Sequence, residues 1–135
     1  MTVAISTDPD QKGWLEIDIT GAASAAAAGL GEIANPEGCT LGITRAFLYF
    51  VTGSTGAANL AIGIGASGAK ATDMVNDTDV IQATVGGKFI YAPAAQVAVT
   101  ESTPAKWTST TYLTFTGSAT TAGLVAKLYV EYIRL

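Results

Sequence analysis

Hydrophobic and polar residues alternate with a period of two over several stretches of this chain, a pattern typical of β-strands with one buried face. The alternation is cleanest at residues 14–20, where Leu15, Ile17 and Ile19 share one face. It returns at residues 124–135, whose more apolar face should point at the core. That face carries Leu124, Ala126, Leu128, Val130 and Tyr132. Further strands are expected at residues 39–52, 59–65, 78–85, 87–91, 96–100 and 110–116.

The segments between these strands are rich in glycine, threonine, serine and proline. Residues 21–38 are the one place where a helix is considered, because alanine favours helix but glycines interrupt the run and Pro36 closes it. A two-turn helix and an extended loop of small residues both remain open there. In the strand at 59–65, Gly63 and Gly65 lie opposite three aliphatic side chains, which indicates that another backbone or a bulky ring lies close.

About eight strands, turn signals between them and no long helix predict an all-β, single-domain antiparallel β-sandwich, jelly-roll-like in its strand number. The length of 135 residues suits one domain. We place an N-terminal arm at residues 1–12 and the sandwich domain at 13–135. The arm is polar and turn-prone around Pro9. Its short apolar run includes Val3 and Ile5, which we expect a partner to order. That partner is either the adjacent subunit or the capsid surface, and addition as a strand to the sheet edge of a neighbour is one way to do so.

The overall composition favours a protein that assembles with other chains over a soluble monomer. Charged residues make up 13% of the chain, hydrophobic residues 49%, and the mean hydropathy is +0.37. A soluble monomer usually carries more charge than this. The net charge is −4 and the seven basic residues are scattered, so no nucleic-acid partner and no anionic membrane surface is expected. No apolar run reaches 18 residues and no signal peptide is recognisable, so we expect no membrane span.

Candidate chemistry is sparse. The chain has no histidine, so Cys39 has no partner for a cysteine–histidine nucleophile and is interpreted as a small buried hydrophobe. Glu16 and Asp18 share a strand face and form a carboxylate pair, as glycosidases require, but solvated charge is the expected reading there. We therefore predict no catalytic residues, no cofactor and no enzymatic activity.

Two further motifs are candidate ligand sites. Gly63-x-Gly65-x-x-Gly68 matches the dinucleotide fingerprint, but no helical pattern follows it, so a glycine-rich strand end is preferred. The densest set of oxygen ligands consists of Asp73, Asn76, Asp77 and Asp79. Their spacing does not match a calcium-binding loop, and Asp and Asn often cap turns, so no metal site is predicted.

Two tryptophans are candidates for an interface or for stacking on a sugar. Trp14 lies opposite Leu15 and Ile17, on the nominally polar face of its strand, where an exposed indole would suit an interface anchor. A second core packed on that face is the alternative. Trp107 is a candidate for the same interface role or for stacking on a sugar.

The stretch from Thr110 to the C-terminus, TTYLTFTGSATTAGLVAKLYVEYIRL, resembles the closing hairpin of small β-sandwich structural proteins of tailed bacteriophages. The segment Ala58–Asp79 has a similar texture. Proteins of this kind decorate or cement capsids, commonly as trimers, and others belong to head fibres or tails. The resemblance implies a homo-oligomer, with a trimer favoured, that binds the major capsid protein on the exterior of the virion after synthesis in the host cytoplasm. The alternative is a carbohydrate-binding or receptor-binding module of a phage fibre or tail, which a Trp/Tyr platform beside the Asp73–Asp79 loop would favour.

Overall fold

The computed structural model describes residues 12–22, 30–81, 86–91 and 106–135, and these form nine β-strands and no helix. In chain order the strands are β1 (Lys12–Thr20), β2 (Gly31–Ala34), β3 (Leu41–Thr52), β4 (Asn59–Gly65), β5 (Val75–Asp79), β6 (Gly86–Tyr91), β7 (Lys106–Trp107), β8 (Tyr112–Gly117) and β9 (Val125–Arg134). Val3 and Ile5 of the predicted arm lie outside the described residues, as does the strand expected at 96–100. Lys12, which the sequence analysis assigns to the arm, is the first residue of β1.

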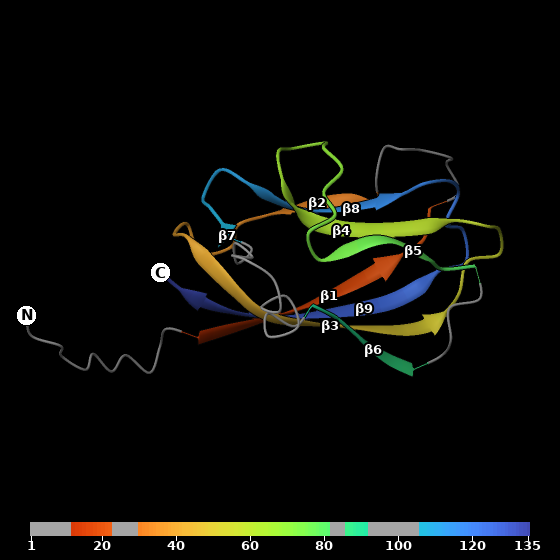
Figure 1. The fold of residues 1–135 in the computed structure, drawn as a ribbon, viewed down its shortest axis with the longest axis horizontal. Helices are drawn as coiled ribbons and strands as arrows, with labels where there is room; N and C mark the ends of the chain where they lie inside the picture. Colours follow the sequence, from red (N-terminus) through yellow and green to blue (C-terminus); the bar gives the residue numbers. More distant parts are fainter. Residues whose placement is uncertain (1–11, 23–29, 82–85, 92–105) are drawn as a thin grey trace, which may run out of the picture.

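The strands form two antiparallel sheets that face each other, as Figure 1 shows. One sheet has the order β1-β9-β3-β6, and the short β7 also pairs with β3. The other has the order β2-β8-β4-β5. Each sheet presents one face to its partner, and the side chains between the two inner faces make the core. The predicted all-β antiparallel sandwich is thereby confirmed.

The strand pairing is nested, and this nesting defines a jelly roll. The innermost pair is β4 with β5, followed outward by β3 with β6, β2 with β8 and β1 with β9. These four pairs form one long two-stranded antiparallel ribbon. The ribbon folds over on itself, and this brings β9 beside β3 and β8 beside β4. Eight strands in this arrangement are those of a jelly roll, with β7 as an addition.

The core is made of the apolar faces that the sequence pattern indicates. On β9 the residues from Leu124 to Tyr132 that were expected to face inward are each at most 3% exposed. On β1, Ile19 is buried, whereas Leu15 and Ile17 are partly covered. Fully burying a side chain of this size contributes about 1.5–3 kcal/mol, so these rows supply much of the drive to fold. The largest fully buried side chains include Trp107, Leu41, Leu48, Leu60, Leu113 and Leu128.

Three elements differ from the sequence-based prediction, one of them the two-residue strand β7, where no strand was expected. Residues 31–34 form strand β2 within the region for which a helix or a loop was expected, because they pair with β8 from Gly31 opposite Phe115 to Ala34 opposite Tyr112. The fifth strand occupies residues 75–79 instead of starting at Thr78. Its first residue, Val75, is buried opposite Ile62 of β4, so pairing with β4 sets this strand in place of local alternation.

The expected close approach at the glycines of β4 is confirmed for Gly63. A Cβ atom at this position would lie 2.0 Å from Oδ1 of Asp73 and 2.8 Å from the backbone carbon of Ala71. The loop between β4 and β5 therefore lies directly against the strand, and the neighbour is a backbone segment with a carboxylate. The same carboxylate accepts the backbone N–H of Ile64 at 3.0 Å, which holds the loop there.

Candidate functional site

The largest gathering of exposed apolar side chains on the described residues lies on the outside of the β1-β9-β3 sheet. We call it the outer β1–β9–β3 face and define it by Trp14, Glu16 and Asp18 of β1, Val125, Lys127, Tyr129 and Glu131 of β9, and Arg45, Phe47, Tyr49 and Val51 of β3. Four of the five large hydrophobic residues that are exposed in the described chain belong to it, namely Trp14 (55%), Tyr49 (37%), Val51 (41%) and Val125 (41%).

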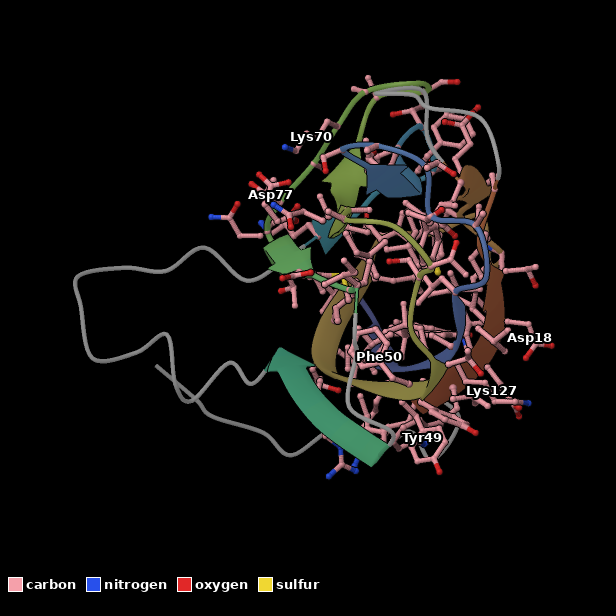
Figure 2. All side chains as sticks on the ribbon, turned by 90° about the vertical axis from the view of Figure 1, so that its right-hand side faces the viewer. Asp18, Tyr49, Phe50, Lys70, Asp77 and Lys127 are labelled. Atoms are coloured by element: carbon pink, nitrogen blue, oxygen red, sulfur yellow. The ribbon has the colours of Figure 1, made fainter. Side chains whose placement is uncertain are left out.

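The face is built by strand register. One row across the three strands consists of Trp14 on β1, Glu131 on β9 and Arg45 on β3. A second row consists of Asp18, Lys127 and Tyr49 on the same three strands. Because neighbouring residues in register point to the same side of a sheet, these rows project together. Figure 2 shows Asp18, Lys127 and Tyr49 on the outside, whereas Phe50, the next residue on β3, points between the sheets.

The face has two groups of charges, and each is paired within the face. Lys127 Nζ lies 2.7 Å from Oε1 of Glu16 and 3.2 Å from Oδ1 of Asp18. Hydrogen bonds to these two carboxylates, Glu16 first, raise the pKa of Lys127. The carboxylate pair that was weighed as a catalytic candidate is thus bridged by an ammonium group, and both carboxylates are exposed to solvent.

The second group surrounds Trp14. The guanidinium of Arg45 lies over the indole ring, 5.3 Å from its centroid, and its Nη2 donates to Oε2 of Glu131 at 2.9 Å. The hydroxyl of Thr44 donates to Oε1 of Glu131 at 2.6 Å, and this hydrogen bond is the main cause of the lowered pKa of Glu131. The five charged side chains of the face contact one another, but three carboxylates stand against two cations, which leaves one negative charge for a partner to neutralise if the face is buried.

The two candidate tryptophans have different positions. Trp14 lies on the outer face, as its register predicted, and no described segment packs a second core over it. Trp107 is 0% exposed and belongs to the core, so its candidate role as an interface residue is corrected. Its Nε1–H donates to the carbonyl of Thr111 at 3.0 Å, which satisfies the one polar atom of the ring. β7 pairs with β3 at this point and carries the indole inward.

The acidic residues of the β4–β5 loop and of strand β5 use their oxygens within the chain. Asp73 accepts the N–H of Ile64, Asp79 accepts the N–H of Ile81 at 2.9 Å, and Asp77 accepts from Lys70 Nζ at 2.7 Å. Asp79 therefore binds the backbone N–H two residues on, as in a capped turn, whereas Asp73 holds the loop against β4. Within the described residues no three His, Cys, Asp or Glu side chains come together closely enough for a metal ion.

The glycine motif after β4 ends in a turn. Residues 66–74 form bends and turns without a helix, so no helix N-terminus follows Gly68 to receive a pyrophosphate. Gly68 has φ of +73°, a conformation that glycine adopts readily. Its N–H donates to Oε2 of Glu32 at 2.8 Å, and the Ser67 hydroxyl donates to Oε1 at 2.6 Å. These bonds, that of Ser67 first, lower the pKa of Glu32 and tie β2 to the loop.

No family model matches this chain, and neither a curated protein nor a solved structure matches it. The described residues contain no helix that is long and apolar enough to cross a membrane. Cys39, the one cysteine of the chain, is half-buried and packs against the core as a small hydrophobe.

Proposed function

We propose that this protein is a capsid decoration (cement) protein, which binds as a homo-oligomer to the exterior of a bacteriophage shell and stabilises it. The observation that carries the proposal is the outer β1–β9–β3 face, where exposed aromatic and aliphatic side chains lie beside ion pairs that form within the face. The resemblance of residues 110–135 to phage structural proteins supplies the shell as partner. The low charge content of the chain supports burial in an assembly.

The mechanism requires no chemical step. The outer face would lie on the major capsid protein, with Trp14 on the edge strand β1 as its largest aromatic anchor, because large aromatic residues dominate the energetics of protein interfaces. Burial of apolar surface across the boundary between capsomers would oppose their separation, since parting them would expose that surface to water again. The jelly-roll sandwich, with its two packed sheets, provides a rigid base for this contact.

The alternative function, carbohydrate binding, required a Trp/Tyr platform beside the Asp73–Asp79 loop. Trp14 and Tyr49 belong to the β1-β9-β3-β6 sheet, whereas the loop belongs to the β2-β8-β4-β5 sheet. The guanidinium of Arg45 also lies over the Trp14 ring, where a sugar would stack. The geometry therefore favours a protein partner.

The test is binding of the purified chain to capsids isolated without it, measured by co-sedimentation. Trp14→Asp should weaken binding at least tenfold, because it removes the largest aromatic side chain of the face and adds a negative charge to a face that already carries an excess of carboxylates. Asn76→Asp is the matched control, since it adds the same charge at an exposed position of β5 on the other sheet. Equal binding by both variants would remove the outer face from the proposal. Imaging of native particles in which the chain lies on the tail, or is absent, would contradict the decoration function itself.

A further inference from the structure

Strand β1 has a long edge that no described strand pairs with and that no bulge interrupts. It lies at the end of its sheet, and among the described strands β9 alone pairs with it. Its nine residues keep one continuous register with β9, from Lys12 opposite Ile133 to Thr20 opposite Val125, without a bulge. It contains no proline. Natural proteins usually shorten, bulge or cover such an edge, because its open N–H and C=O groups bind other strands.

A groove lies beside the second half of this edge. It has a volume of about 150 Å³ and separates β1 from β2, the edge strand of the other sheet. Its apolar lining comes from Ile17, Ile19, Leu30, Ile33 and Phe115. Three of these, Ile17, Leu30 and Ile33, are only partly buried. A strand added to the edge of β1 would direct every second side chain into this groove, since side chains alternate between the faces of a sheet.

We propose that the edge of β1 and the groove between β1 and β2 form a strand-addition site for residues 2–6 of a second copy of this chain. The sequence of that segment is Thr-Val-Ala-Ile-Ser, in which Val3 and Ile5 have the spacing that places both in the groove. The segment carries no charged side chain, so it meets Glu16 and Asp18 on the outer side without repulsion. Main-chain hydrogen bonds to β1 would supply affinity and the two aliphatic side chains specificity.

The reach of the arm is sufficient for a second copy. Residues 1–11 lead directly into β1 at Lys12, and eleven extended residues span about 36–40 Å. The nine residues of β1 are about 30 Å long at the usual rise of a strand. The arm can therefore leave its own subunit and lie along the β1 edge of an adjacent one.

The arm of the same subunit fits the site poorly. Folded back on β1 as a hairpin with a loop at residues 7–11, or with a tight loop at residues 9–10, it would place Val3 beside residue 15 or 16 and Ile5 beside residue 13 or 14. The groove is bordered by residues 17–20 of β1, beyond the reach of either side chain. A second copy has no such restriction, because its arm approaches from outside.

This inference rests on the self-association within the proposed function and is independent of the shell. Each subunit would bind the β1 edge of one neighbour with its own arm, and its own β1 edge would bind the arm of another neighbour. Such a heterologous contact closes into a ring when the rotation between subunits permits, which suits the trimer that the resemblance implies.

Light scattering should find the full chain as a closed oligomer, and the variant lacking residues 2–6 as a monomer near 13 kDa with an unchanged far-UV spectrum. A synthetic peptide of residues 1–11 should then bind to the shortened chain. Ile5→Lys in the peptide should weaken this binding at least tenfold, whereas Ala4→Lys, which adds the same charge on the outward side, should not. A full-length monomer, a shortened chain that stays oligomeric, no peptide binding, or equal effects of the two lysines would each overturn the inference. Capsid binding by Trp14→Asp, measured separately, distinguishes this outcome from failure of the proposed function.

Discussion

Glu37 and Arg134 form a bidentate salt bridge that joins the two sheets at one end of the sandwich. Arg134 donates from Nη2 to Oε1 of Glu37 at 2.9 Å and from Nε to Oε2 at 3.0 Å. The hydroxyl of Tyr132 donates to the same carboxylate at 2.7 Å. Glu37 follows β2 of one sheet, and Arg134 ends β9 of the other. This carboxylate therefore connects two segments that are 97 residues apart.

Asn35 shapes the turn that presents Glu37. Its Oδ1 accepts the N–H groups of Glu37 and Gly38 at 2.9 and 3.1 Å. Its Nδ2 donates to the carbonyls of Cys39 and Trp107 at 2.8 Å each. The turn is thus fixed by one amide side chain that uses its oxygen and its nitrogen, and it holds Glu37 opposite Arg134.

The first prediction concerns pH. Hydrogen bonds from Arg134, and then from Tyr132, lower the pKa of Glu37 from 4.5 to about 2. Because the folded pKa lies below the unfolded one, the stabilisation from this group is complete above about pH 4.5 and is lost as pH falls through 2. Glu37→Gln should therefore lower the melting temperature at pH 7, and its difference from wild type should shrink towards pH 2. The melting temperature of Tyr132→Phe at pH 7 should lie between those of Glu37→Gln and the wild type. A difference that stays constant from pH 7 to 2 would contradict this assignment.

The second prediction concerns Gly63. A methyl group at this position would collide with the Ala71 backbone and the Asp73 carboxylate, so Gly63→Ala should destabilise the fold by about 1–3 kcal/mol, as overpacking does. Gly56→Ala is the control, because the nearest atom to a Cβ at that position is Cγ2 of Thr120 at 3.9 Å. Urea unfolding of both variants measures the difference. Equal midpoints would show that the β4–β5 loop moves aside at little cost.

The third prediction concerns calcium. The carboxylates of Asp73, Asp77 and Asp79 already bind Ile64, Lys70 and Ile81, respectively, and a cation would have to displace these partners. Thermal melts with excess chelator and with millimolar calcium should therefore agree. A ligand that binds only the folded state raises its stability by mass action, so a rise above about 5 °C with calcium would mean that the loop rearranges into a site.

The strands that the sequence predicts well are those whose burial is one-sided or whose residues strongly favour strands. β4 was expected at 59–65 and lies there, and the inward row of β9 was identified residue by residue. Alternation reports burial because each strand of a sandwich has one face in the core. β8 departs from this rule, since the polar Thr114 and Thr116 are buried as well. The Thr114 hydroxyl donates to the carbonyl of Gly63 at 3.2 Å, so this buried polar group keeps a hydrogen-bond partner.

Features set by distant partners could not be predicted from local pattern. β2 has four residues, two of them Gly31 and Ala34, and it exists because β8 pairs with it across some eighty positions of sequence. The bond between Glu37 and Arg134 left no signal in either neighbourhood. For the candidate surface, the outward side of Trp14 was predictable from alternation. Its neighbour Arg45 was not, because β3 and β1 meet only through β9.

The last prediction separates the two tryptophans. Trp107→Ala should destabilise the protein by about 3–5 kcal/mol, because it empties a fully buried site and leaves the carbonyl of Thr111 without its donor. Trp14→Ala should cost about 1 kcal/mol or less, the value of an exposed cation–π contact with Arg45. Denaturant unfolding measures both. Fluorescence gives an independent readout: acrylamide should quench Trp14 in a Trp107→Phe background, and Trp107 should resist quenching in a Trp14→Phe background. If the two indoles are quenched equally in the full-length oligomer but differ in the chain lacking residues 2–6, then the outer face around Trp14 is itself covered by self-association, and the shell would have to bind elsewhere.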